Sequence, residues 1–162
     1  MSKLIIIRGP SGAGKSAVAK DLFKQVTRPT ALIERDYYMF MFKTGSDTKV
    51  PNKELLESNI LICLNHDFDV IFEGNFKIDT HKQLLDRLFA AHPHDNYIFY
   101  LDVSLAESLR RHNTRSEKII SEEKMTELHG YTTPMQHPNE TIVPETFSLE
   151  QTVNLIRKTA NI

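Results

Sequence analysis

The sequence of 162 residues has a single cysteine, no tryptophan and almost no excess of charge. One cysteine, Cys63, excludes an internal disulfide and is typical of a reducing compartment such as the cytoplasm. The 20 basic and 21 acidic residues give a formal net charge of −1, so no overall basic field attracts nucleic acid or an anionic membrane. The composition therefore disfavours extended nucleic acid as a partner.

Long apolar runs are also missing from the sequence. No stretch approaches the roughly 20 consecutive apolar residues of a membrane span. The run from Leu4 to Ile7 is too short for the apolar part of a secretory signal peptide. We therefore expect a cytoplasmic protein with no membrane partner, in which residues 1–162 form a single domain.

The sequence around the single thiol and the histidines does not indicate a nucleophile or a metal site. Cys63 lies in the apolar run 60–64 without an electropositive neighbour in sequence, so we expect a buried thiol rather than a nucleophile. The seven histidines show no spacing typical of metal ligands, which argues against a zinc site.

Short β-branched runs alternate with longer helical patterns along the chain. Strands are expected at residues 4–7, 30–33, 70–72, 97–101 and 141–143. Helices are expected at residues 15–26, 53–64 with Asn52 as cap, 80–91, from Ser104 onward, 121–129 and from Ser148 to about residue 159. The alternation predicts βαβ units and a parallel sheet, with loops at residues 37–50 and 131–139.

Residues 9–16 read GPSGAGKS and match the pattern G-x-x-x-x-G-K-[ST] in full. Glycines let consecutive backbone N–H groups approach a phosphate, and the helix that follows points its positive end at it. Lys15 is expected to reach the β- and γ-phosphates, and the Ser16 hydroxyl to coordinate Mg²⁺. The residues expected to bind ATP, which we take over GTP by default, are Gly9, Pro10, Ser11, Gly12, Ala13, Gly14, Lys15, Ser16 and Ala17.

Charged residues follow the second expected strand, at the edge of a parallel sheet where ligands bind. Asp36 is a candidate general base that accepts the proton of an attacking hydroxyl group. Arg35 and Tyr38 are candidate substrate-binding residues, Arg35 for a phosphate or carboxylate. The apolar run 37–42 suits a core segment or an apolar wall for a substrate, and we favour the core.

The third expected strand ends in Glu73-Gly74-Asn75. An acid after a buried apolar strand resembles a Walker B residue, so Glu73 is expected to hold Mg²⁺ through water or to align the nucleophile. Asn75 is a candidate substrate-binding residue at the same edge. Asp69 would lie at the opposite end of the sheet, and we expect it to be structural.

Three arginines, Arg110, Arg111 and Arg115, lie on or just after the helix expected from Ser104. Arg111 and Arg115 would share a face if that helix continues. Phosphoryl transfer needs mobile cations, which arginines on a closing lid can supply, although most charge runs are solvated faces. We expect a lid at residues 110–130, with Arg111 and Arg115 taking part in catalysis.

At these residues the sequence resembles a group of P-loop kinases with an AAA-33-type ATP-binding domain, which includes polynucleotide 5′-hydroxyl kinases, zeta-toxin-like kinases and chloramphenicol phosphotransferase. The resemblance is carried by residues 4–16, 35–38, 70–75 and 107–118, and the polynucleotide kinase branch is most similar. It implies an α/β three-layer sandwich with five parallel strands in the order 2-3-1-4-5 and helices on both faces. It also implies Asp36 as the general base and Arg115 as the residue that stabilises the transferring phosphoryl group.

Two functions remain open. The first is an ATP-dependent kinase that phosphorylates a hydroxyl of a small molecule, a nucleoside-type compound or an oligonucleotide 5′ end. The second is a nucleotide-binding switch or regulatory ATPase without an acceptor, in which the run 37–42 would contact a partner protein. The sequence leaves the acceptor and the oligomeric state, monomer or dimer, undetermined.

Overall fold

A five-stranded parallel sheet runs through the centre of the computed structural model, which describes residues 1–43, 51–114 and 120–162. Its strands are β1 (Leu4–Arg8), β2 (Thr30–Glu34), β3 (Asp69–Gly74), β4 (Asn96–Asp102) and β5 (Glu140–Pro144). They lie in the order β2-β3-β1-β4-β5 with parallel pairing throughout. The expected sheet and strand order are confirmed.

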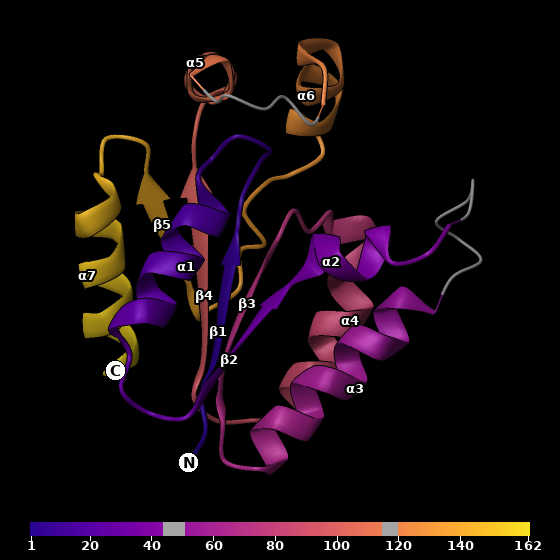
Figure 1. The fold of residues 1–162 in the computed structure, drawn as a ribbon, viewed down its shortest axis with the longest axis vertical. Helices are drawn as coiled ribbons and strands as arrows, with labels where there is room; N and C mark the ends of the chain where they lie inside the picture. The colour runs from indigo at the N-terminus through magenta and orange to yellow at the C-terminus, as the bar shows by residue number, and fades with distance from the viewer. Residues whose placement is uncertain (44–50, 115–119) are drawn as a thin grey trace.

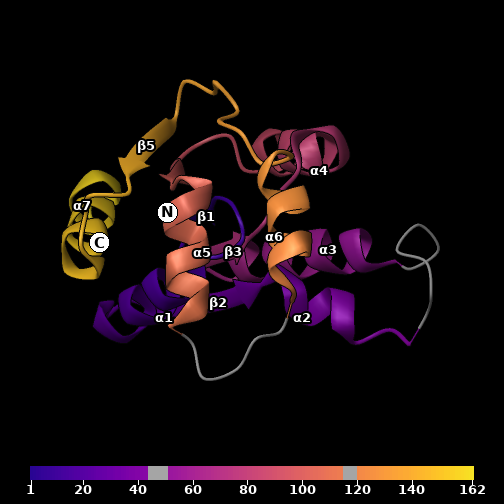
Figure 2. The same ribbon diagram turned by 90° about the horizontal axis from the view of Figure 1, so that it is seen from above.

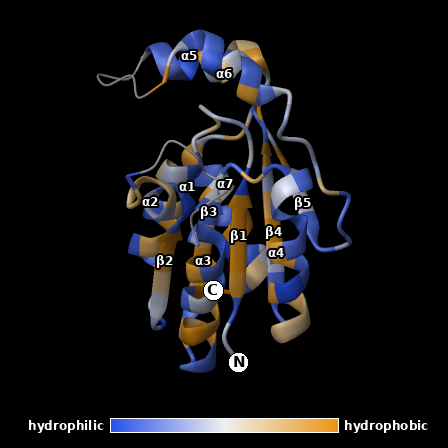
Figure 3. Ribbon diagram, turned by 90° about the vertical axis from the view of Figure 1, so that its right-hand side faces the viewer, coloured by the Kyte–Doolittle hydropathy of each residue, from blue (hydrophilic) through white to orange (hydrophobic). Residues whose placement is uncertain are grey.

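Four long helices cover the two faces of the sheet (Figures 1 and 2). One face carries α1 (Lys15–Gln25) and α7 (Leu149–Ala160), and the other carries α3 (Asn52–Asn65) and α4 (Ile78–Ala91). Because successive strand side chains alternate between faces, β1 supplies Ile5 and Ile7 to the first apolar cluster and Leu4 and Ile6 to the second. The apolar central strand therefore needs cover on both sides (Figure 3).

The remaining helices lie at the carboxyl edge of the sheet. α2 (Arg35–Phe40) follows β2 directly, whereas α5 (Leu105–Asn113) and α6 (Glu122–His129) lie beyond the strand ends (Figure 1). Ser104 and Ser121 cap α5 and α6 by accepting backbone N–H groups, and Ser148 forms a full capping box at α7. None of the helices in the described ranges is long and apolar enough to cross a membrane.

Two expectations about the segment after β2 are wrong. Residues 37–40 of the expected loop 37–50 belong to α2, and residues 44–50 of it lie outside the described residues. The side chains of Tyr37 and Phe40 are 74% and 73% exposed, so they are not core residues. The four long helices already cover both sheet faces, and none of the six residues of α2 is buried. Tyr37, Phe40 and Met41 therefore form an exposed apolar surface beside the carboxyl edge, whereas Tyr38 packs against the second apolar cluster.

Smaller differences concern α3. Pro51, not Asn52, is the N-cap residue, because Asn52 is already the first helical residue and its side chain is buried. Cys63 is half-buried against the second apolar cluster rather than fully buried, and burial raises the pKa of its thiol. A raised pKa disfavours the thiolate, which agrees with the expectation that Cys63 is not a nucleophile.

Candidate active site

The phosphate-binding loop joins β1 to α1 at the carboxyl edge of the sheet. Gly12 has φ 83°, a left-handed conformation that side chains other than glycine rarely adopt. A Cβ on Gly12 would also lie 2.8 Å from both the Ser108 carbonyl oxygen and Met125 Cε. Glycine is therefore required both by the backbone turn and by the close approach of α5 and α6.

Lys15 begins α1 and turns its side chain back into this loop. Its Nζ donates a hydrogen bond of 2.8 Å to the Pro10 carbonyl oxygen, and the residue is 9% exposed. The Lys15 ammonium group thus lies against the loop at residues 9–16, as the expected contact with the β- and γ-phosphates would require.

Ser16 and Glu73 bring the loop and the third strand together. Ser16 Oγ donates a hydrogen bond of 2.9 Å to Glu73 Oε1, and Glu73 is 4% exposed. Burial raises the pKa of the Glu73 carboxyl, while the positive charge of Lys15 and the Ser16 hydrogen bond lower it and the charge of Asp36 raises it. A hydroxyl and a carboxylate oxygen are the hard ligands that suit Mg²⁺, which usually keeps several waters beside one or two protein ligands. The pair therefore fits the expected magnesium site.

Arg35 and Asp36 open α2 on the far side of Glu73. Arg35 Nη1 lies 3.2 Å from Asp36 Oδ1, and the side chains are 13% and 64% exposed. Arg35 Nε donates a hydrogen bond of 3.1 Å to Nε2 of His81, a buried residue of α4. The structure thus adds His81 to this cluster, and no spacing in the sequence indicated it.

Asn75 connects the phosphate loop with the segment after α6. Its Nδ2 donates a hydrogen bond of 3.3 Å to Ser11 Oγ, and its Oδ1 accepts one from Thr132 Oγ1. Tyr38, in contrast, bonds through its hydroxyl to Asn59 of α3 and packs against the second apolar cluster. Of the three expected substrate-binding residues, Arg35 and Asn75 thus bond to residues of this edge, whereas Tyr38 bonds to α3.

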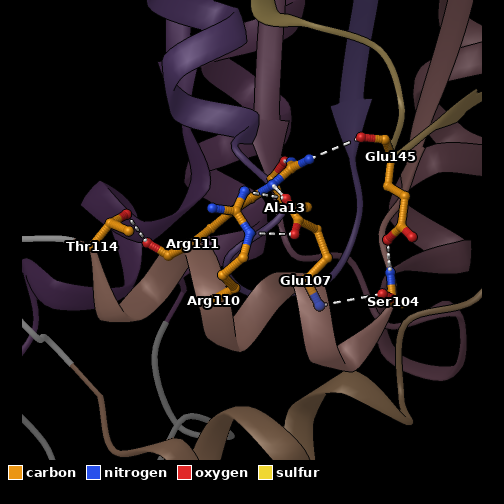
Figure 4. Close-up of polar contacts among 7 residues, drawn as sticks. All are labelled: Ala13, Ser104, Glu107, Arg110, Arg111, Thr114 and Glu145. Carbon is orange, nitrogen blue, oxygen red and sulfur yellow. Dashed lines mark hydrogen bonds and ion pairs between the residues drawn. The ribbon is translucent and has the colours of Figure 1, made fainter.

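Arg110 and Arg111, the two arginines of the expected lid that lie within the described residues, differ in their partners (Figure 4). Both bond to Glu107, and these hydrogen bonds, from Arg110 first and Arg111 second, lower the Glu107 pKa to about 2. Arg111 also donates to the Ala13 carbonyl oxygen at 2.9 Å and to the Glu145 carbonyl oxygen at 3.1 Å. Arg111 therefore joins α5 to the phosphate loop, and Arg110 does not. Arg115 lies outside the described residues.

A cavity of about 290 Å³ lies beside the phosphate loop, between α1, α5 and the start of α7. Gly14 and Arg111 line its polar side, while Val18, Leu101 and Phe147 supply apolar surface. An apolar slot next to an arginine suits a planar aromatic ring, because guanidinium groups stack on ring faces.

Comparison with known proteins places the chain in a family. A family model described as an AAA domain, AAA_33, matches residues 4–134. The chain belongs to the AAA_33 family. No curated protein sequence matches it.

Solved structures similar to this AAA_33 protein include several kinases. A sugar kinase from Janibacter sp. HTCC2649 has 13% identity, with 100% of this chain and 96% of that chain covered and a TM-score of 0.81. The APS kinase CysC of Mycobacterium tuberculosis, in complex with AMPPNP and APS, has 14% identity, coverage of 99% and 98% and a TM-score of 0.79. A gluconokinase from Sinorhizobium meliloti 1021 has 15% identity, coverage of 98% and 91% and a TM-score of 0.74. At these identities the likeness shows a P-loop kinase-like fold.

A buried arginine of this AAA_33 protein lies behind the site and was missed from the sequence. Arg8, the last residue of β1, is 0% exposed and its Nη1 pairs with Glu140 Oε1 at 2.7 Å. Its Nη2 donates to the carbonyl oxygens of Phe76 and Thr133 at 3.2 and 2.7 Å, and its guanidinium carbon lies 5.0 Å from the centre of the Tyr100 ring. The only signal in the sequence was a charged residue that ends an otherwise apolar strand.

This group, which we call the Arg8 clamp (Arg8, Tyr100 and Glu140), fixes the segment after α6. Tyr100 donates its hydroxyl to the Thr132 carbonyl oxygen at 2.8 Å, and Glu140 Oε2 accepts the backbone N–H groups of Met135 and Gln136 at 2.7 and 3.0 Å. The Thr132 side chain then holds Asn75. A segment expected to be a loop is thus ordered by a buried ion pair of the AAA_33 core.

Proposed function

We propose that this chain is a kinase that transfers the γ-phosphate of ATP to a hydroxyl group. The observation that carries the proposal is the Ser16–Glu73 hydrogen bond, which joins a phosphate loop to an acid, with Asp36 close enough for its charge to raise the Glu73 pKa. A loop for the nucleotide, oxygen ligands for a metal and an exposed carboxylate beyond them are the parts that phosphoryl transfer requires. The kinase neighbours support it through their shared fold.

The nucleotide binds at the α1 side of the site. The base occupies the cavity beside Arg111, and the phosphates lie over the loop at residues 9–16, with Lys15 exchanging the Pro10 carbonyl for phosphate oxygens. Ser16 and Glu73 would hold Mg²⁺, which would supply positive charge to neutralise the phosphates. Arg111, which already reaches the loop, and Arg115 add positive charge from the lid.

The acceptor hydroxyl lies on the α2 side, beside Asp36. Its oxygen forms a bond to the γ-phosphorus while the bond from that phosphorus to the bridging oxygen of ADP breaks. The hydroxyl proton passes to the Asp36 carboxylate, which is 64% exposed. α5 and α6, which lie against Gly12, help to exclude water, which otherwise competes for the phosphoryl group. The acceptor is a small molecule, a nucleoside-type compound or an oligonucleotide 5′ end.

Replacement of the base tests the proposal. Asp36→Asn should lower acceptor-dependent ADP formation by about 100-fold or more, the usual size of general-base catalysis, and leave the affinity for Mg²⁺–AMPPNP unchanged. Asp79→Asn, a change at an exposed acid in the first turn of α4, is the matched control. Loss of nucleotide affinity together with transfer would contradict the role given to Asp36.

A second function is supported by a separate observation. The exposed Tyr37, Phe40 and Met41 of the α2 region form an apolar surface suited to a partner protein, as a regulatory ATPase would need. Such a protein would form ADP slowly and at the same rate with or without any acceptor. Turnover measured with and without an acceptor panel separates the two functions.

A further inference from the structure

The guanidinium of Arg35 is held in one orientation by three elements. A Cβ on Gly74 would lie 2.6 Å from Arg35 Cβ and 3.1 Å from its Cδ, so the side chain lies directly across the end of β3. Asp36 holds Nη1 at 3.2 Å, and His81 holds Nε at 3.1 Å. A long and otherwise flexible side chain is thus already ordered before any ligand binds, which lowers the entropy lost on binding.

His81 can support Arg35 only as a neutral ring of one tautomer. Because Nε2 accepts a hydrogen bond from Arg35, the proton lies on Nδ1, where Thr80 Oγ1 is 2.8 Å and the Lys77 carbonyl oxygen 3.2 Å away. The ring packs on Phe76 with 5.6 Å between ring centres, and the residue is 3% exposed. This buried histidine has no part in the proposed transfer step other than to hold Arg35.

One edge of the guanidinium remains available. Nη2 of Arg35 has no hydrogen-bond partner among the described residues, and the side chain keeps 13% exposure. The acceptor side therefore offers an oriented arginine next to the carboxylate that takes the proton.

We propose that Arg35 binds an anionic group on the acceptor and that His81 is its positioning residue. The proposal rests on the proposed function and names its substrate class: a hydroxyl compound that also carries a carboxylate or a phosphate. Arginine suits both groups because its planar donors match two oxygens of an anion. The competing interpretation is that Arg35 only orients Asp36, in which case a neutral acceptor would serve equally well.

Binding measured apart from turnover provides the first test. With the phosphate loop filled by saturating Mg²⁺–AMPPNP, inorganic phosphate should raise the melting temperature of the wild-type protein and should do so much less in Arg35→Gln. Lys82→Gln, which removes an exposed cation on α4, should respond like the wild type. An equal response of the wild type and Arg35→Gln would overturn the proposal.

Matched acceptors provide the second test. Glycerate and glycerol, and ribose 5-phosphate and ribose, differ by one anionic group. Calorimetry on the protein loaded with Mg²⁺–AMPPNP should show the anionic member of each pair binding about 10-fold tighter or more, as expected for charge-assisted hydrogen bonds. Arg35→Gln should abolish the difference. Equal affinity within both pairs would contradict the proposal even if transfer occurs.

The role of His81 is tested by rescue. Gln places an oxygen where Nε2 accepts from Arg35, so His81→Gln should keep the preference for the anionic member, whereas His81→Leu should lose most of it with Mg²⁺–AMPPNP affinity unchanged. For any acceptor that turns over, His81→Leu should raise KM more than it lowers kcat. A preference for the anionic acceptor that is kept in His81→Leu would contradict the positioning role of His81.

Anion binding without any acceptor-dependent turnover would overturn the kinase function and leave the anion site standing.

Discussion

The nucleotide side and the acceptor side of this site are built in different ways. The nucleotide side consists mainly of one continuous segment, residues 9–17, whose backbone shape carries the chemistry. The acceptor side is assembled from contacts between residues far apart in sequence: 46 residues separate Arg35 from His81, 57 separate Asn75 from Thr132, and 125 separate Arg8 from Thr133. A local motif can be recognised before the fold is known, whereas an assembled site depends on the sheet that brings its parts together.

The largest expected effect lies on the assembled side. Arg8→Met leaves the buried Glu140 carboxylate without its partner, so the free energy of unfolding should fall by about 3–5 kcal/mol. Urea unfolding measures this loss. Below the midpoint, the folded fraction should still bind Mg²⁺–AMPPNP with an affinity close to that of the wild type, because the phosphate loop is local.

A double variant gives the control for the Arg8 clamp. Arg8→Met combined with Glu140→Met removes both charges and should recover part of the stability, although the N–H groups of Met135 and Gln136 lose their acceptor. A single Arg8→Met variant as stable as the wild type would show that the clamp does not order the segment after α6.

On the nucleotide side we expect a loss of activity with stability unchanged, the opposite of the result expected for Arg8→Met. Lys15→Met should lower transfer by about 100- to 1000-fold, as expected when one donor to a developing charge is removed, with little change in the urea midpoint. Lys24→Met, at an exposed position in the last turn of α1, is the matched control. A Lys15→Met protein that unfolds as readily as Arg8→Met would break the distinction between the two sides.

This distinction also explains how far the sequence could be interpreted. The strands, their parallel pairing and the caps at Ser104 and Ser148 follow from local patterns, and so does the GPSGAGKS loop. The pairing of Glu73 with Ser16 follows once β1 and β3 are neighbours. The Arg8 clamp and His81 could not be predicted, because a buried ion pair and a tautomer-specific hydrogen bond leave no spacing in the sequence. Tyr37 and Phe40 misled the prediction because apolar character alone does not distinguish core from exposed surface.

The neighbouring residues Arg110 and Arg111 test whether α5 supports the nucleotide side through a specific contact with the phosphate loop. Arg111→Gln should weaken Mg²⁺–AMPPNP binding by roughly 10-fold, because Arg111, unlike Arg110, donates a hydrogen bond to the Ala13 carbonyl oxygen of the phosphate loop. Both arginines line the cavity proposed for the base, so the difference between the variants isolates this contact. Arg110→Gln, which removes the same charge one residue away, should change the affinity little, since Glu107 is the one hydrogen-bond partner of Arg110 among the described residues. Calorimetry measures both. An equal loss in the two variants would mean that the lid acts through its charge and not through this contact.

The smallest expected effect is on the pKa of Glu107. For this pKa Arg110 should matter more than Arg111, the reverse of their order in nucleotide binding. The Glu107 pKa of about 2 is held down most by Arg110 and next by Arg111, so Arg110→Gln should raise it further than Arg111→Gln does. Because the folded pKa lies below the ordinary value of 4.5, the stabilisation is complete above pH 4.5 and disappears as the pH falls toward 2. Carbon NMR of the Glu107 carboxyl follows the titration, and Glu127, whose pKa Lys124 lowers on α6, should titrate unchanged in both variants. A wild-type midpoint near 4.5 would mean that these ion pairs do not form in solution, and that Arg111 approaches the phosphate loop without the support of Glu107.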